Sequence, residues 1–253
     1  MIGEEFSSGD SFIHRIDPRI KIVIVVLFSI VIAVADRFPV LFSGVFFSVG
    51  LIAIARLSII KVLYRLLIVN GFIFLLWVFL PFTFPGETLF SIGALNASRD
   101  GVIYALLITI KSNAIILASI ALLATSSITT LVHALRHIYV PDKLVHLFFF
   151  CYRYINVIYL EYVRLTNAMK IRCFKPKTNM HTYKTYAYLV GMLLLKSYDR
   201  SERVYNAMLC RGFKGKFWML DHFSLKKSDL VSGIIMLICI IGLVLLQWGQ
   251  IVL

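Results

Sequence analysis

Charge is scarce in this sequence, and acidic side chains are scarcer than basic ones. Only 15% of the 253 residues are Asp, Glu, Lys or Arg, whereas 60% are hydrophobic, and the mean hydropathy is +0.87. This composition lies far from that of soluble domains and excludes an ordinary water-soluble globular protein. We therefore expect an integral membrane protein.

Cysteine motifs and a cleavable leader are also missing. The four cysteines form no C-x-x-C motif and no regular framework, so we expect reduced thiols and no disulfides. The first ten residues are polar and acidic, whereas a signal peptide begins with a basic region followed by an apolar core. The first spanning helix is therefore expected to act as its own insertion signal. The cysteines are Cys151, Cys173, Cys210 and Cys239.

Long apolar runs predict an all-α polytopic membrane protein with about five transmembrane helices. A helix needs about 20 apolar residues to cross a bilayer, and the runs lie at residues 20–35, 40–56, 62–81, 101–124 and 230–250. The first two are short and are separated by the sequence Asp36-Arg37-Phe38-Pro39. They are compatible with tilted spans, a re-entrant pair or one broken unit.

The basic residues orient these spans and divide the chain into four regions. Of the 26 Lys and Arg residues, 17 lie between residues 125 and 229 against 6 of the 13 acids, so this segment holds +11 of the net charge of +13. Because Lys and Arg gather in cytoplasmic loops, we expect a multi-pass protein of a prokaryotic inner membrane with its N-terminus and residues 125–229 in the cytoplasm. The predicted regions are an N-terminal segment (1–19), four spans (20–124), a cytoplasmic domain (125–229) and a last span (230–253).

The cytoplasmic domain mixes charge with apolar residues, as amphipathic helices at a membrane boundary do. In the second of its two clear helices, an apolar face is expected opposite a basic one. We expect a lipid surface and protein partners, not nucleic acid, to meet this charge. The apolar face comprises Leu194, Tyr198, Ser201, Tyr205 and Met208, and the basic face comprises Lys196, Arg200, Arg203 and Arg211.

A pattern within this domain occurs twice. Residues 164–177 and 203–216 both read R-x-x-N-A-M-x-x-R-x-F-K-x-K, beginning at Arg164 and Arg203. Pro176 should end the first helix just after Arg172, and Gly212 with Gly215 should end the second near Arg211. Each arginine would then project outward from a final helical turn.

Two interpretations of these arginines remain open. Arg172 and Arg211 could pair with carboxylates of a partner, because a guanidinium presents a rigid fork of donors. Small Ala168 and Ala207 would allow that partner to approach, and the rings of Phe174 and Phe213 would fill its apolar pocket. Alternatively, the arginines only stabilise helix C-termini and hold the surface near lipid phosphates.

Residues 10–21 (DSFIHRIDPRIK) and 197–213 (SYDRSERVYNAMLCRGF) resemble the signatures of a known family. The chain is similar over nearly its whole length to the transmembrane T component of energy-coupling factor (ECF) transporters, in its cobalt or nickel branch. The resemblance implies that long coupling helices dock into two ATP-binding-cassette (ABC) ATPase subunits through Arg172 and Arg211. In the family a glycine commonly follows each arginine; Gly212 matches, whereas Cys173 departs from the pattern.

The resemblance also implies a substrate-binding membrane subunit, the S component, beside this chain. ATP would be bound by the ATPase subunits, and no cofactor is expected in this chain. We therefore expect a non-catalytic scaffold for cobalt uptake, with a nickel or vitamin transporter as the alternative. An intramembrane enzyme is disfavoured because the sequence has no HExxH motif, no serine elbow and no intramembrane carboxylate pair. A stand-alone carrier is disfavoured because the repeated pattern lies in the predicted cytoplasmic domain and not in the membrane spans.

Three further features have competing explanations. Asp17 and Pro18 suit a helix start, whereas the resemblance implies that His14, Arg15 and Asp17 brace the coupling helices. His133 and His137 share a helix face but have no evident third ligand, so we expect no metal site. Lys111 with Asn113 is expected to form a mid-span polar cluster that bonds one helix to another. Arg65 should lie at the membrane–water interface, and Asn70 should lie near a helix end, be paired or face protein.

Overall fold

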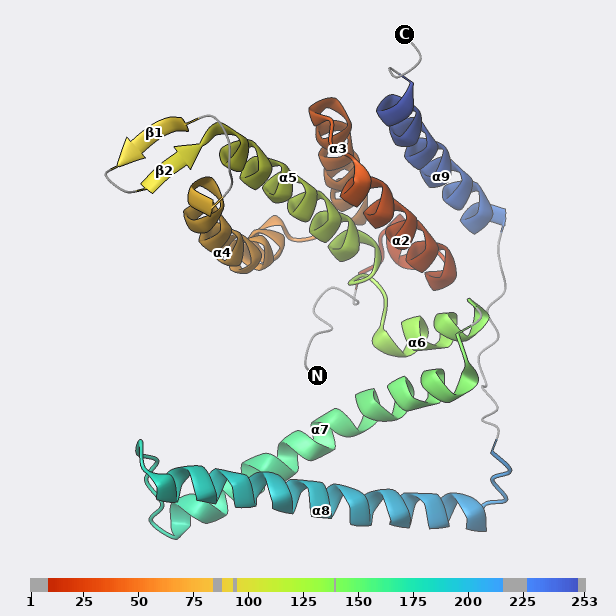
Figure 1. Ribbon diagram of the computed structural model, residues 1–253. Coiled ribbons are helices and arrows are strands. Elements are labelled where there is room, and N and C mark those ends of the chain that lie inside the picture. Colours follow the sequence, from red (N-terminus) through yellow and green to blue (C-terminus); the bar gives the residue numbers. More distant parts are fainter. Residues whose placement is uncertain (1–8, 84–87, 93–94, 139, 216–226, 250–253) are drawn as a thin grey trace. The chain divides into compact units, whose positions relative to one another are not determined.

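The computed structural model describes residues 9–83, 88–92, 95–138, 140–215 and 227–249 (Figure 1). Residues 1–8 of the predicted N-terminal segment, residues 216–226 of the predicted cytoplasmic domain and the last four residues of the final region lie outside these ranges, as does Lys216 of the repeat. The chain divides into two compact units, one comprising residues 139–222 and the other most of the remaining chain.

The larger unit holds most of the helices. Its elements are α1 (Phe12–Arg15), α2 (Pro18–Val34), α3 (Phe38–Ala55), α4 (Ile59–Thr83), β1 (Thr88–Ile92), β2 (Leu95–Ser98), α5 (Arg99–Leu122), α6 (Ile128–His137) and α9 (Lys227–Trp248). The smaller unit consists of α7 (Asp142–Ile171) and α8 (Met180–Cys210) (Figure 1).

All five predicted apolar runs form helices. Four of the described helices, α3, α4, α5 and α9, are long and apolar enough to cross a membrane. Helix α2 has 17 residues, which is the lower end of the usual length for a span. The prediction of an all-α polytopic membrane protein is confirmed, and α2 and α3 are two separate helices with Pro39 in the first turn of α3.

A short hairpin interrupts the helices between α4 and α5. Strands β1 and β2 pair antiparallel, with Phe90 opposite Ala97 and Ile92 opposite Leu95. Neither this hairpin nor the single turn α1 was expected from the sequence. Neither contains an apolar run of the length on which the span predictions rest.

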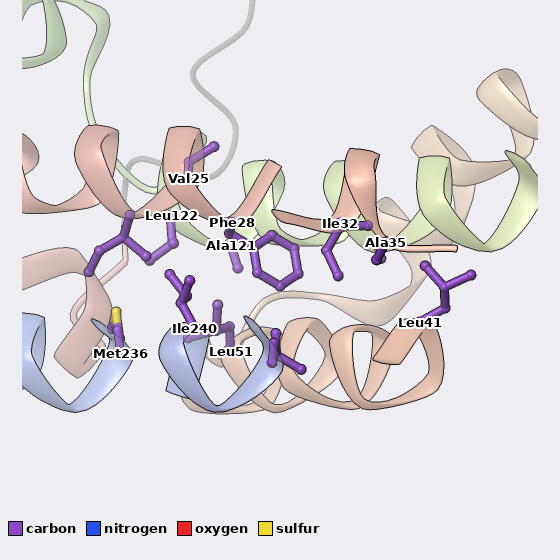
Figure 2. Packing of buried hydrophobic residues seen from close by; sticks show 14 of the residues in the cluster. Val25, Phe28, Ile32, Ala35, Leu41, Leu51, Ala121, Leu122, Met236 and Ile240 are labelled. Carbon is purple, nitrogen blue, oxygen red and sulfur yellow. The ribbon is translucent and has the colours of Figure 1, made fainter. Parts of the chain in front are cut away.

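Helices α2, α3, α5 and α9 enclose the core of the larger unit. Figure 2 shows Phe28 and Ile32 of α2 among side chains of the other three helices, and both are fully buried. Small residues allow this close packing: a Cβ added to Gly44 of α3 would lie 2.4 Å from the Ile32 Cδ1 atom. Buried Ala114 and Ala118 serve the same purpose on α5, because small side chains let membrane helices approach each other.

Polar side chains join α4 to α5. Asn70 and Asn113 exchange two hydrogen bonds of 3.1 Å, and Trp77 Nε1 donates to Thr109 Oγ1 at 2.9 Å. The prediction that Asn113 bonds one helix to another is confirmed. Lys111 also bonds α5 to another helix, as predicted, but apart from Asn113: it donates to the Ala33 carbonyl of α2 and to the Asp36 carboxylate, each at 3.0 Å.

Candidate functional site

The candidate site consists of the C-terminal ends of α7 and α8. Helix α7 ends at Ile171 and is capped by Arg172, while α8 ends at Cys210 and is capped by Arg211. Both helix ends therefore fall where Pro176 and Gly212 predicted them. Because the two copies of the repeat have the same spacing, matching residues occupy the same positions in the two caps.

The end of α8 has the hydrogen bonds of a Schellman motif. The Gly212 N–H donates to the Leu209 carbonyl at 2.9 Å, and the Phe213 N–H donates to the Met208 carbonyl at 3.0 Å. Gly212 has φ +78°, a left-handed conformation that glycine adopts without penalty. The cap satisfies two carbonyls that the helix end would leave without partners.

The end of α7 repeats this arrangement without the glycine. The Cys173 N–H donates to the Lys170 carbonyl at 3.0 Å, and the Phe174 N–H donates to the Met169 carbonyl at 3.1 Å. Cys173 has φ +60°, so it takes the same left-handed conformation as Gly212 despite its side chain. The departure from the family pattern at Cys173 therefore leaves the geometry of the turn unchanged.

The side chains expected to meet a partner differ in exposure. Arg172 and Arg211 are exposed, as are Ala168 and Ala207 one turn earlier. Within the described part of the chain, neither arginine forms a salt bridge. Both guanidinium groups thus have donors available to an incoming carboxylate.

The two phenylalanines are half-buried, in part against their own unit. The Phe174 ring lies 6.0 Å from the Tyr186 ring and 6.2 Å from the His181 ring, measured between centroids. Phe213 is half-buried as well. Phe174 therefore stabilises the turn between α7 and α8, and the prediction that it fills a partner's pocket stays a prediction.

A basic hollow of about 620 Å³ lies beside Arg172. Its lining contains four basic side chains and, among the described residues, no acidic one. Such a surface favours an anionic partner. The basic side chains are Arg172, Lys175, Lys177 and His181.

A buried ion pair joins α7 to α8. Glu161 of α7 is 8% exposed, and its carboxylate accepts hydrogen bonds from Lys196 of α8 and, at 2.9 Å, from Arg164. The hydrogen bond from Lys196, assisted by the charges of Lys196, Arg164 and Arg200, lowers the pKa of Glu161 below its ordinary value, although burial opposes this shift.

Part of the predicted basic face of α8 is thus turned towards α7. Arg200 lines a cavity of about 350 Å³ with apolar side chains of α7, whereas Leu194 and Tyr198 are each 68% exposed. Arg203, by contrast, is exposed. The physical reason is Glu161, which turns Lys196 towards α7. Glu161 is the only acidic residue between positions 143 and 198, and this isolation was the available signal.

Two other predicted features have simpler roles. The Asp17 carboxylate accepts a hydrogen bond from the Arg19 N–H at 2.9 Å, so it caps α2 as predicted. His133 and His137 stand with ring centroids 5.5 Å apart. Over the described residues, no group of three or more His, Cys, Asp and Glu side chains could hold a metal ion.

Comparison with known proteins identifies a matching family and several relatives of this chain. The family model described as CbiQ, cobalt transport protein, matches residues 9–219. The energy-coupling factor transporter transmembrane protein EcfT of Acidaminococcus fermentans is 26% identical over 97% of this chain and 96% of its own length. EcfT of Lactococcus lactis is 24% identical over 99% of this chain and 98% of its own. An uncharacterized protein of Methanocaldococcus jannaschii is 23% identical over 97% of this chain and 86% of its own length.

Proposed function

Because the chain belongs to the CbiQ family and is a transmembrane T component of an energy-coupling factor transporter, we propose that it couples ATP hydrolysis to substrate uptake. It is a non-catalytic, multi-pass subunit of a membrane complex. In our proposal, its partners are two ABC-type ATPases, which bind the ATP, and a substrate-binding S component. Its N-terminus and the α7–α8 unit would face the cytoplasm.

The pair of matching helix ends carries this proposal. Arg172 and Arg211 occupy the same position in two caps with the same hydrogen bonds, and both side chains are exposed. Two equivalent arginines suit two equivalent receptors, as a pair of ATPase subunits would supply. A stabilising role towards the helix dipole alone would not require the cap and the neighbouring Asn-Ala-Met sequence to be repeated.

The ion pair of Glu161 supports a lever mechanism. When ATP binding and hydrolysis move the ATPase subunits, the two helix ends would move with them. Lys196 ties α8 to Glu161 of α7, so displacement of one helix is passed to the other. Exposed apolar side chains on both helices, such as Ile155 (57%) and Leu194 (68%), would then act on the S component.

Cobalt is the cargo that we propose, because the matching family is described as a cobalt transport protein. Nickel or a vitamin is the alternative, since the relatives named EcfT carry no cargo in their names. Uptake of radioactive cobalt(II), nickel(II) and vitamins by cells that express the whole transporter distinguishes these cargoes.

Reversal of both charges tests the docking assignment. We expect Arg172→Glu with Arg211→Glu to abolish co-purification with the ATPases and uptake, because loss of one desolvated arginine–carboxylate contact costs about 2–5 kcal/mol. Lys143→Glu with Arg153→Glu is the matched control, since these exposed side chains lie on α7, 29 and 19 positions before its capping Arg172, and the pair changes the net charge equally. Normal assembly and uptake by the arginine variant would refute the assignment.

A further inference from the structure

Lys21, in the first turn of α2, is buried in the larger unit. Only 1% of its surface is exposed, and it is the largest fully buried side chain among the described residues. Its Nζ atom lies 2.7 Å from Ser126 Oγ and 3.5 Å from Thr125 Oγ1. Both hydroxyls belong to the connection between α5 and α6, more than 100 positions further along the chain.

Two buried carboxylates complete this cluster. Asp17, at the start of α2, is 6% exposed, and Asp229, in the first turn of α9, is 7% exposed. Burial disfavours the charged form of Lys21, and the charges of both carboxylates offset part of that cost. Because a buried charge is costly unless paired and hydrogen-bonded, these partners and Lys21 depend on each other for their position.

The cluster lies within the larger unit, at the segments that precede and follow the α7–α8 unit in the sequence. Ser126 is followed by Ser127, whose side chain caps α6, and α6 leads directly into α7. Asp229 is the first acidic residue of α9, the helix that follows α8. Ser232 holds this turn by donating to the Asp229 carbonyl at 2.9 Å. The start of α2 therefore meets both segments: Lys21 binds Ser126, and Ile20 packs against Gly233 of α9, where an added Cβ would lie 3.0 Å from the Ile20 Cγ2 atom.

We propose that Lys21 is a positioning residue that fixes both connections to the α7–α8 unit and thereby passes movement of that unit to the membrane helices. The proposal rests on the proposed function, because it assigns Lys21 a role in coupling. Hydrogen bonds suit this role better than apolar packing, because they fix both the distance and the direction of the groups they join.

Hydrogen exchange of the full chain in nanodiscs tests the positioning. In Lys21→Met, which replaces the ammonium group by an apolar one, we expect amide exchange at residues 126–131 and 229–233 to rise about tenfold or more, the factor expected for a charged hydrogen bond. Exchange at residues 109–115 of α5 should stay as in the wild type. If exchange rises at only one connection, at neither, or throughout the chain, the positioning role is refuted.

Lys111→Met is the matched control. Lys111 also binds α2 through its ammonium group, but it reaches the opposite end of that helix at Ala33 and Asp36. Its variant should leave exchange at both connections unchanged. If Lys21→Met does not fold, Ser126→Ala removes a single acceptor instead, and we expect the same pattern with an increase of about threefold.

The complete transporter in liposomes tests the coupling. We expect Lys21→Met to assemble with the ATPases and hydrolyse ATP, but to import at least about tenfold less cobalt(II) per ATP, whereas Lys111→Met keeps the wild-type ratio. A wild-type ratio for an assembled Lys21→Met complex, or an equal loss in Lys111→Met, would refute the inference alone. Failure of the wild-type chain to bind ATPases would instead refute the proposed function.

Discussion

At the scale of single residues, the two caps meet one backbone requirement with different side chains. The position after each capping arginine needs φ near +60° to +80°, which Gly212 adopts freely and Cys173 adopts with its Cβ crowded against the backbone. The same hydrogen bonds form in both caps. The first cap is therefore expected to be the less stable one, although both point the arginine outward.

Restoring glycine should strengthen the first cap. We expect Cys173→Gly to stabilise the end of α7 by about 1 kcal/mol, because it removes the cost of a left-handed side-chain residue. Gly212→Cys should destabilise the end of α8 by a similar amount. Amide exchange at Cys173 and Phe174, compared with Gly212 and Phe213, measures both changes. Slower exchange in Gly212→Cys than in the wild type would contradict this explanation.

At the scale of helices, the contact between α7 and α8 depends on one carboxylate. Glu161 is buried and joins Lys196 of the facing helix to Arg164 of its own. Removing the negative charge would leave Lys196 without its partner at this contact. The contact is therefore expected to respond to acid, whereas the helix caps, which are formed by backbone groups, are not.

The lowered pKa of Glu161 fixes the sign of this response. Because the folded-state pKa lies below the ordinary value of 4.5, the stabilisation is complete above that value and is lost as the pH falls through the folded-state pKa. We expect exchange at residues 157–164 and 193–200, corrected for its intrinsic rate, to be constant from neutral pH to about pH 5 and to rise in stronger acid.

Glu161→Gln provides the control for this response. Its contact should be as weak at neutral pH as the wild-type contact is in strong acid, and exchange in the same two segments should lose its dependence on acid. A variant that keeps the wild-type pH profile would show that another group titrates. Lys170, in the last turn of α7, lies outside both measured segments, so exchange around it should not follow this profile.

Local signals in the sequence were sufficient for the helix ends but not for the contacts between helices. Pro176 and Gly212 act on their own backbone, so the ends of α7 and α8 could be predicted from neighbouring residues alone. The partners of Lys196 and Lys21 lie 35 and more than 100 positions away, respectively. Helical periodicity placed Lys196 on the basic face of its own helix, but it does not show which distant residues the fold brings close to Lys196 or to Lys21.

At the scale of the whole molecule, natural cysteines lie beside both proposed docking residues. Cys173 directly follows Arg172, and Cys210 directly precedes Arg211. Both are exposed, as is Cys151, which lies in α7, 21 positions before Arg172, and lines the cavity between α7 and α8. Cys239 lies in α9, one of the helices able to span the membrane. The wild-type chain thus carries its own reporters of topology and docking.

Labelling these thiols tests both properties together. A membrane-impermeant maleimide should modify Cys173 and Cys210 in inverted vesicles and not in right-side-out vesicles, if the α7–α8 unit faces the cytoplasm. Addition of the ATPases should then slow labelling of Cys173 and Cys210 about tenfold or more, because a docked interface excludes the reagent, while Cys151 reacts as before. Labelling in right-side-out vesicles would contradict the orientation. Equal protection of Cys151 would place the ATPases along the helices, and protection of one cap alone would mean that the two arginines do not have equivalent receptors.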